Sequence, residues 1–268
     1  MTEWFEEWFG EEYLALYPHR DEAEAEQAVG LVLSSTGFAA GWRVLDVACG
    51  AGRHARALRR AGARCFGVDL SATLLRIART VTDAPLVRAD MRSLPIRPAS
   101  MDLTVNLFTS FGYFDDPSEQ DAVIGNMARS LRPGGHVVLD YLNPRYADDH
   151  MKPAEDIEVE GNRYRIRRWT DGRCFYKRIA IDDGRGGEPM VYREQVARFS
   201  LGDFERLLVP HGLEIVELYG DYRLNPYDTR TSPRLVLIAR QLLADAADSL
   251  RRHAEIGREH PLRNAQRQ

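Results

Sequence analysis

The segment with the clearest chemical meaning is Val-Leu-Asp-Val-Ala-Cys-Gly-Ala-Gly-Arg-His-Ala, residues 44–55. An apolar run typical of a buried strand reaches Asp46, and a turn built on Ala48, Gly50 and Gly52 then leads into a helical pattern. Glycine lets the backbone turn sharply and lets a ligand approach without interference from a Cβ atom. The segment therefore predicts a cofactor site between a strand and a helix. The alternative is a tight strand-to-helix turn that binds nothing.

Two further acids close later strand-like runs. Asp69 ends Phe-Gly-Val-Asp, where a carboxylate can accept hydrogen bonds from two ribose hydroxyls. This spacing suits nicotinamide and adenosyl cofactors alike. Asp90 lies in Arg-Ala-Asp-Met-Arg, where its carboxylate can accept a hydrogen bond from an exocyclic adenine amine while Met91 covers the ring. A surface turn is the alternative for Asp90.

A parallel sheet is needed to bring these residues together. After an N-terminal helical segment, short apolar runs alternate with helical patterns, which is typical of a parallel sheet covered on both faces. Ser71 is a good N-cap for the helix after the second strand, and Pro133-Gly134-Gly135 ends the helix before the fifth. Five core strands are predicted, at 42–49, 64–70, 85–90, 101–108 and 135–142.

The pattern changes after the fifth strand. Residues 156–199 contain three strand-like pieces with turn signals at 171–172 and 183–187, which predicts an inserted antiparallel sheet. Ser200-Leu-Gly-Asp203 resembles a capping box that opens a helix over 201–213. Two last strands are predicted at 214–222 and 234–240. Because too few residues join them for a helical crossover, the final strand should run antiparallel.

Taken in order, four motifs resemble the class I S-adenosylmethionine-dependent methyltransferases, and the resemblance covers residues 40–143. The motifs are Asp-x-Ala-Cys-Gly-x-Gly, Val-Asp-Leu-Ser, Ala-Asp-Met-Arg and Leu-Arg-Pro-Gly-Gly. The resemblance implies an α/β, Rossmann-like, seven-stranded and mostly parallel sheet with an antiparallel last strand and helices on both faces, here with the inserted antiparallel β-sheet. It implies an enzyme that takes a methyl group from S-adenosyl-L-methionine and releases S-adenosyl-L-homocysteine.

The same resemblance assigns the cofactor contacts. Asp46 and the turn at 48–52 would lie against the methionine part, Asp69 against the ribose, and Asp90 with Met91 against adenine. Ala48 stands where many members carry a glycine, a small change that should be tolerated. The expected cofactor-binding residues are Tyr17, Arg20, Asp46, Ala48, Gly50, Gly52, Asp69, Leu70, Asp90, Met91 and Leu107.

A narrower likeness is to small-molecule N-methyltransferases, especially those that methylate amino sugars in antibiotic pathways. Leu107-Phe-Thr-Ser-Phe-Gly-Tyr113 and the inserted sheet resemble that group, and Tyr13-x-x-x-Tyr17-x-x-Arg20 resembles its lid segment. The expected acceptor is thus a small molecule with an N- or O-nucleophile, in secondary metabolism.

The acceptor pocket should lie outside the carboxyl ends of the strands. Tyrosine faces and hydroxyls suit a cationic acceptor, although each tyrosine could equally serve packing. His19 is the candidate base, because an unperturbed imidazole titrates near neutral pH, although a lid or surface role is the more frequent one. The catalytic candidates are Tyr17, His19, Tyr113 and Tyr141. Further expected pocket residues are Thr109, Ser110, Asn143, Asp221, Tyr222, Tyr227 and Arg20.

Several basic residues have a plain structural interpretation. Arg163, Arg165 and Arg167 alternate and so share one face of a strand; they could grip an anionic acceptor, but such a row is more often a solvated outer face. Arg53 and His54 open the first helix of the sheet, where they could simply cap or solvate it.

Composition bounds the compartment and the partners. The net charge of -4 disfavours nucleic acid, and no apolar run is long enough to cross a bilayer. The acidic, aromatic start is unlike a signal peptide, so a cytoplasmic protein is expected. Three scattered cysteines and seven histidines without a cluster predict no metal site.

The predicted organisation has four parts. They are a helical lid (1–40), the Rossmann-like core (41–150 and 200–241), the inserted antiparallel sheet near the acceptor site (151–199) and a helical tail (242–268). The tail could pack on the core, fray, or pair with a second copy to form a homodimer.

Three rival functions stay open at this stage. A nicotinamide (NAD(P))-dependent oxidoreductase is compatible with the glycine turn, but the chain lacks a Tyr-x-x-x-Lys pair. An RNA- or DNA-modifying methyltransferase that acts on amines usually carries Asn/Asp-Pro-Pro-aromatic after strand four, and this chain has Phe108-Thr-Ser-Phe there instead. The third is a binding protein that keeps the adenosyl cofactor as a regulatory ligand.

Overall fold

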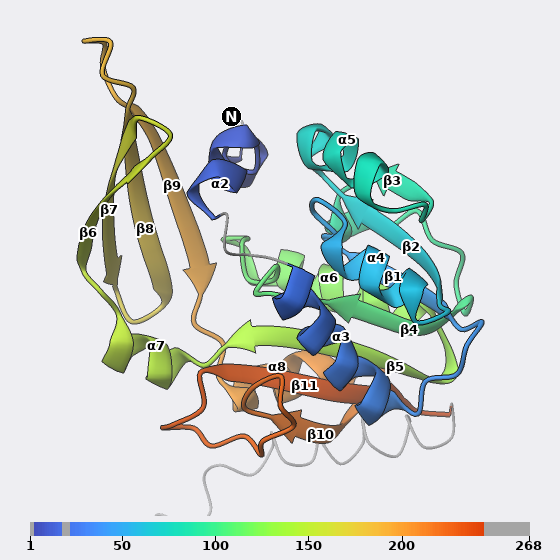
Figure 1. Cartoon of the computed structure of the whole chain (residues 1–268). Coiled ribbons are helices and arrows are strands. Elements are labelled where there is room, and N and C mark those ends of the chain that lie inside the picture. Colours follow the sequence, from blue (N-terminus) through green and yellow to red (C-terminus); the bar gives the residue numbers. More distant parts are fainter. Residues whose placement is uncertain (1–2, 18–21, 244–268) are drawn as a thin grey trace, which may run out of the picture.

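The computed structural model of the chain describes residues 3–17 and 22–243. A seven-stranded sheet in the order β10-β11-β5-β4-β1-β2-β3 forms its centre (Figure 1). β1 to β5 run parallel, and β11 is antiparallel to both of its neighbours, as predicted. The strands are β1 (Arg43–Val47), β2 (Arg64–Asp69), β3 (Leu86–Arg88), β4 (Met101–Asn106), β5 (Leu131–Leu142), β10 (Leu213–Tyr219) and β11 (Arg234–Gln241).

Helices cover both faces of this sheet. The side chain of Ser71 accepts the amide of Leu74 at the start of α5, and the capping box of Ser200 and Asp203 opens α8. Both caps were predicted. The helices are α3 (Glu22–Thr36), α4 (Arg53–Arg60), α5 (Ala72–Val81), α6 (Pro117–Ser130), α7 (Pro144–His150) and α8 (Leu201–Leu208), with short 3₁₀ turns at η1 (Met91–Ser93) and η2 (Val209–His211).

The boundaries differ from the prediction in two places. β5 begins at Leu131 instead of 135, because this segment already pairs with Met101 of β4 before a register shift. Pro133-Gly134-Gly135 therefore lies inside β5, and the preceding helix ends earlier than predicted, at Ser130. The helix predicted over 201–213 ends at Leu208 and continues only as the 3₁₀ turn η2, which contains Pro210.

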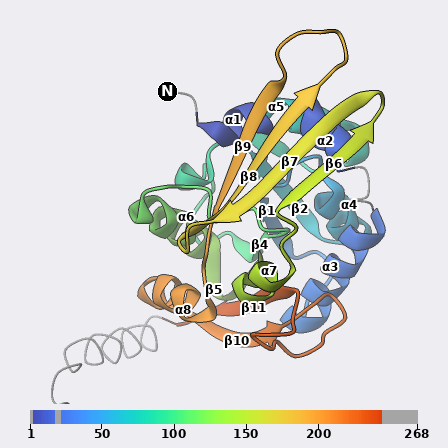
Figure 2. The same ribbon diagram turned by 90° about the vertical axis from the view of Figure 1, so that its left-hand side faces the viewer.

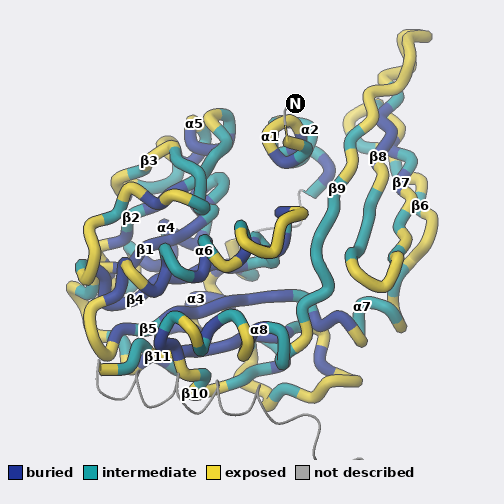
Figure 3. Tube along the Cα trace, turned by 180° about the vertical axis from the view of Figure 1, so that it is seen from behind, coloured by how far each residue is buried: buried dark blue, intermediate teal, exposed yellow. Residues whose placement is uncertain are grey.

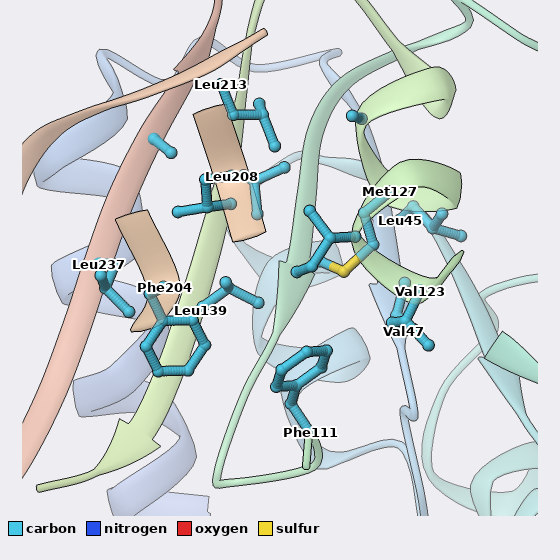
Figure 4. Close-up of a cluster of buried hydrophobic side chains, with 14 of the residues drawn as sticks. Leu45, Val47, Phe111, Val123, Met127, Leu139, Phe204, Leu208, Leu213 and Leu237 are labelled. Atoms are coloured by element: carbon cyan, nitrogen blue, oxygen red, sulfur yellow. The ribbon is translucent and has the colours of Figure 1, made fainter. Parts of the chain in front are cut away.

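Alternating strand residues divide the core into two layers. Val44, Val138 and Val236 pack toward α3 and α4. Their neighbours Leu45, Leu139 and Leu237 pack with residues of α6 and α8 on the other face (Figure 4). Burial on both faces explains why the strands are near-continuous apolar runs, and each buried leucine contributes about 2 kcal/mol of transfer free energy. The central strands are accordingly the buried part of the trace in Figure 3.

A separate antiparallel sheet in the order β6-β7-β8-β9 follows β5 and α7 in the chain. It has four strands, not the three predicted pieces, because a two-residue turn at Glu160-Gly161 divides the first piece. Both turn residues have positive φ angles, 50° and 80°, as a tight hairpin requires. The strands are β6 (Ala154–Val159), β7 (Asn162–Thr170), β8 (Cys174–Asp182) and β9 (Met190–Ala197).

Two short N-terminal helices, α1 (Trp4–Trp8) and α2 (Glu11–Leu16), pack on one face of the four-stranded sheet (Figure 2). Trp8 and Leu16 share a buried cluster with Ile166, Ile179 and other residues of that sheet. His19, Arg20 and residues 244–268 of the predicted tail lie outside the described residues. Within the described ranges, no helix is long and apolar enough to cross a membrane.

Candidate active site

A cavity of about 690 Å³ opens at the carboxyl ends of β1, β2 and β4, between the main sheet, the N-terminal helices and β9. It brings together most of the predicted cofactor residues: Tyr17, Ala48, Gly50, Asp69, Leu70, Asp90, Met91 and Leu107 all line it. Asp46 and Gly52 do not line it. Thr109, Ser110 and Tyr113 of the predicted acceptor set lie at the same cavity.

The glycine turn uses its two glycines differently. Gly50 has a φ of 54°, and a Cβ added to it would meet only Leu74, at 3.9 Å, so its backbone faces open space. Gly52 has a φ of 83°, and an added Cβ would lie 2.9 Å from the Cβ of Ala78 in α5. Gly52 therefore allows α4 to pack closely against α5. Because Gly52 does not line the cavity, the expectation that it touches the cofactor stays a prediction.

Two alanine substitutions should separate these roles. Both Gly50→Ala and Gly52→Ala place a Cβ at positive φ, which costs roughly 1–2 kcal/mol. We expect Gly52→Ala to lose about 1–3 kcal/mol more, because the added Cβ overpacks the contact with α5. We expect Gly50→Ala to be the milder of the two in thermal melting but to lose about tenfold in affinity for the adenosyl ligand by calorimetry. The opposite ranking in the two measurements would contradict this assignment.

Asp69 closes β2 and faces the cavity. Its Oδ2 accepts the backbone amide of Gly50 and its Oδ1 that of Ser71, both at 2.8 Å. Burial raises the pKa of Asp69, and these backbone hydrogen bonds partly oppose the shift. Because a carboxylate offers about four lone-pair positions, each oxygen keeps one for a ligand. The geometry thus fits two ribose hydroxyls, as the sequence predicts.

Asp46 lies beneath the glycine turn with 1% of its surface exposed. Burial, and then the charge of Asp69, raise its pKa from 3.8 to about 8. Its Oδ2 has no hydrogen-bond partner among the described residues. Asp46 is buried and does not line the cavity, so its expected place against the methionine part stays a prediction.

The raised pKa of Asp46 predicts a pH dependence of stability. The folded state keeps a proton that the unfolded chain releases above its ordinary pKa of 3.8. The stabilisation is therefore complete below that pH and is lost as the pH rises toward about 8. Asparagine mimics the protonated acid, so the melting temperature of Asp46→Asn should fall less than that of the wild type between roughly pH 5 and pH 8.5. Parallel curves without ligand would contradict this account.

Asp90 reaches the cavity but is already engaged. Its Oδ1 accepts the amide of Arg92 at 2.8 Å, and its Oδ2 accepts Nε and Nη2 of the same residue at 2.9 and 2.6 Å. Burial alone would raise the pKa of Asp90, but these bonds hold it below its usual value. One lone-pair position remains on Oδ1, and Met91 lies beside it on the cavity wall, so a purine amine still fits.

The far end of the cavity is aromatic. The hydroxyl of Tyr113 donates to the carbonyl of Thr109 at 2.8 Å. Its ring centroid lies 5.1 Å from that of Trp4 and 5.6 Å from that of Phe9. The ring of Tyr17 lies 4.5 Å from the ammonium of Lys177. The N-terminal helices thus supply much of this wall: Tyr13 and Tyr17 belong to the lid segment that the sequence predicts, whereas Trp4 and Phe9 were not selected there.

Other predicted acceptor residues lie elsewhere. Tyr141 is buried in the core beside Phe204, and its hydroxyl donates to the carbonyl of Ala197, so its proposed catalytic place is corrected. Asn143 is also buried, and its side-chain amide donates to carbonyls of residues 228, 229 and 232. Asp221, Tyr222 and Tyr227 do not line the cavity either.

The row of alternating arginines lies on a solvated outer face, the more frequent of the two interpretations given above. These residues are Arg163, Arg165 and Arg167. They form ion pairs with Asp156 and Asp182 on the four-stranded sheet.

A buried ionic network holds the turn after β4. Asp140 accepts the backbone amide of Phe108 at 2.8 Å and the hydroxyl of Tyr222 at 2.6 Å, and it pairs with Arg234. Phe108 and Thr109 both have left-handed φ angles, 63° and 59°, a strained conformation for residues with side chains. The network therefore fixes a backbone segment that faces the cavity.

Arg53, His54 and Arg234 line the cavity, although the sequence analysis gave the first two only a capping or solvent role. The guanidinium of Arg53 lies 4.5 Å from the ring of Phe108, and that of Arg234 lies 5.3 Å from it. Burial, followed by the charges of the two arginines, lowers the pKa of His54 to about 3, so this imidazole is neutral. Its Nε2 is buried and has no partner among the described residues.

These features fit an adenosyl cofactor. The open backbone at Gly50 and the spare lone pairs of Asp69 both belong to the cavity wall or its turn. Across the described ranges, no group of three or more His, Cys, Asp or Glu side chains is placed to hold a metal ion.

Comparisons with known proteins indicate a methyltransferase family. Residues 44–135 match a family model described as a methyltransferase domain. The chain is 36% identical over 179 residues to the dTDP-3-amino-3,6-dideoxy-alpha-D-glucopyranose N,N-dimethyltransferase of Streptomyces fradiae, covering 64% of this chain and 70% of the relative. It is 28% identical to the cypemycin N-terminal methyltransferase of a Streptomyces species, covering 75% of this chain and 84% of that one.

The fold has counterparts among solved structures. An S-adenosylmethionine-dependent methyltransferase from Clostridium acetobutylicum superimposes with a TM-score of 0.73 at 17% identity, over 86% of this chain and 96% of that one. Fold, cavity and relatives lead to one conclusion: the chain belongs to the class I S-adenosylmethionine-dependent methyltransferases of the amino-sugar type and is an enzyme that uses S-adenosyl-L-methionine to methylate a small molecule.

Proposed function

We propose that the enzyme methylates the nitrogen of an amine on a small acceptor, with an amino sugar as the leading class. The observation that carries this proposal is that the glycine turn after β1, an aromatic wall and the carboxylate of Glu194 all line the same cavity. Aromatic faces and a carboxylate both attract an amine that carries positive charge. The names of the two Streptomyces relatives, which refer to an amino sugar and to the N-terminus of a peptide, support an amine acceptor.

The proposed cofactor contacts follow from the geometry. Asp69 would hold the ribose hydroxyls, Asp90 with Met91 would hold the adenine, and the backbone at Gly50 would lie against the methionine part. S-Adenosylmethionine supplies an electrophilic methyl group on its sulfonium. The protein then has to exclude water and to hold the acceptor nitrogen in line with that methyl group.

Tyr113 is the proposed residue for orienting the acceptor. Its hydroxyl donates to the carbonyl of Thr109, and this bond holds the ring at the cavity wall on the acceptor side. Tyr17 would cover the reacting group with its ring. His19, the base candidate, lies outside the described residues and remains a prediction.

The proposed partners and compartment rest on the sequence alone. The net charge of -4 supports a small molecule over a nucleic acid as the acceptor. A cytoplasmic location and pairing of two copies through the tail remain predictions.

The test combines binding with turnover. Calorimetry with S-adenosylmethionine, S-adenosylhomocysteine and NADH should show binding of both adenosyl ligands and not of NADH. Radiolabelled methyl transfer is then measured with amino sugars, nucleotide-linked amino sugars, peptide amines and matched hydroxyl analogues. Transfer to an amine and not to its hydroxyl analogue is the expected result. Transfer only to hydroxyl acceptors, or to none of them, would overturn the proposal.

A further inference from the structure

A second cavity of about 430 Å³ lies against the four-stranded sheet and α7. Its wall includes Ala147 and His150 of α7 and Phe175 and Lys177 of β8. Leu142, Glu194 and Val196 line this cavity and the main cavity as well. Because three side chains face both spaces, the two cavities adjoin at these residues.

A row of charged side chains crosses this face of the sheet, one from each strand. Arg168 of β7 lies opposite Lys177 of β8, and Lys177 lies opposite Glu194 of β9. Glu155 of β6 pairs with Arg168 at 2.9 Å, and Glu194 pairs with Lys177 at 3.2 Å. The two cations are thus neutralised from the outer strands, and Glu194 is the member of the row that also reaches the main cavity.

Glu194 is held firmly and still has capacity to bind. Its Oε1 accepts the indole N–H of Trp8 at 2.6 Å, and the ammonium of Lys177 donates to both carboxylate oxygens at 3.2 Å. With about four lone-pair positions on a carboxylate, one position on Oε2 remains. The side chain is 19% exposed, so a bond made there is only partly screened by water.

The other carboxylates that line the main cavity are already bound to protein groups. Asp69 holds the glycine turn, Asp90 is engaged by Arg92, and Glu22 forms an ion pair with Arg56. Glu194 is therefore the lining carboxylate that stands at the junction with the second cavity.

We propose that Glu194 binds the amine of the acceptor at this junction, so that the reacting nitrogen lies in the main cavity and the body of the acceptor extends into the second. This inference rests on the proposed function and deepens it. The N–H of the acceptor donates to Oε2, next to the ring of Tyr17 that the Lys177 ammonium already contacts. A protonated amine is also attracted by the negative charge of Glu194, an attraction that a neutral hydroxyl lacks, so Glu194 favours binding of an amine over a hydroxyl. The site further requires an acceptor with a body large enough to reach the second cavity.

Glu194→Gln tests the charge with little change of shape. Its matched control is Glu158→Gln, the same substitution at an exposed position of β6 in the same sheet. With the amine that the wild type methylates best, we expect the KM of Glu194→Gln for the amine to rise at least about tenfold. The KM of Glu194→Gln for S-adenosylmethionine should stay within about twofold of the wild type. For Glu158→Gln, the KM for the amine and the KM for S-adenosylmethionine should both stay within about twofold. Inhibition by the matched hydroxyl analogue should be unchanged, so the preference for the amine is lost.

Each outcome separates the two proposals. If the wild type methylates no amine, the proposed function fails and this inference fails with it. If the wild type methylates an amine and Glu194→Gln keeps its KM, or weakens amine and hydroxyl analogue equally, the proposed function stands and Glu194 is not the amine ligand. Should Glu194→Gln also lose cofactor binding, Lys177→Gln decides: removing the competing cation should lower the KM for the amine, and a rise would overturn the inference.

Discussion

Asp69→Ala should weaken the binding of S-adenosylmethionine by about 100-fold or more. The spare lone pairs of Asp69 are the proposed acceptors for both ribose hydroxyls, and a hydrogen bond to a charged group contributes about 1.5–3 kcal/mol. The variant also releases the amide of Gly50, whose 2.8 Å bond to Asp69 holds the glycine turn in place. The measurement is a calorimetric titration of the folded variant with S-adenosylmethionine and S-adenosylhomocysteine.

Two further variants make this result interpretable. Asp83→Ala removes an exposed carboxylate that pairs with Arg59, and it should leave cofactor affinity unchanged. Asp69→Asn keeps the shape but turns an amide toward one of the two backbone N–H donors, so it should lose affinity nearly as strongly as the alanine variant. Affinity within threefold of the wild type in a well-folded Asp69→Ala protein would exclude Asp69 as the ribose ligand.

Asp140→Asn should be the most destabilising single change in the site. The Asp140 side chain has no exposed surface, and its partner Arg234 is 18% exposed. Burial alone would lower the pKa of Arg234, but Asp140 and then Tyr222 hold it above its ordinary value, so the guanidinium keeps its charge. Leaving one member of a buried pair unpaired costs about 3–5 kcal/mol. For a chain of this size, the melting temperature should fall by roughly 10 °C.

Asp140→Asn should also slow methyl transfer, because the left-handed turn at Phe108 and Thr109 loses its anchor. Asp83→Asn is the control, since its ion pair with Arg59 is exposed and water screens it. A melting temperature lowered by less than about 3 °C would show that the network contributes little to stability.

Local sequence signals were sufficient for the main sheet. Short stretches of sequence predicted the apolar strand that ends near Asp46 and the turn of small residues after it. They also predicted the acids that follow the next strands, Asp69 and Asp90. A buried parallel strand has to be apolar on both faces, and the turn after it has to allow positive φ angles. Both properties depend on residues that are adjacent in the sequence, so a short stretch of sequence is enough to predict them. The cap at Ser71 was predictable for the same reason. The Glu160-Gly161 turn was missed because it is only two residues long and lacks the usual Asn or Asp.

The acceptor end was predicted only in part: Thr109, Ser110 and Tyr113 line the cavity, whereas Tyr141 does not. Tyr141 ends the same strand as Leu142, and the alternation of side chains sends Tyr141 into the core and Leu142 toward the cavity. Which of two adjacent residues faces the ligand depends on strand register, and register is set by the partner strand. The sequence therefore identified the right strand and the wrong residue.

The sequence by itself determined most of the cofactor half of this enzyme, because its residues directly follow the carboxyl ends of apolar parallel strands. They are Gly50 after β1, Asp69 at the end of β2, Asp90 after β3 and Leu107 after β4. Only the tertiary structure revealed the part of the acceptor side that the second sheet supplies. The carboxylate of Glu194 accepts hydrogen bonds from Trp8 of the N-terminal helices and from Lys177 of the second sheet. Trp8 and Glu194 are 186 positions apart in the sequence. No local pattern marks Glu194, since a charged residue on a strand is more often solvated. Glu194 reaches the cavity because α1 packs on the face of the four-stranded sheet that carries Glu194. This contact joins segments that are far apart in the sequence, so neighbouring residues do not predict it.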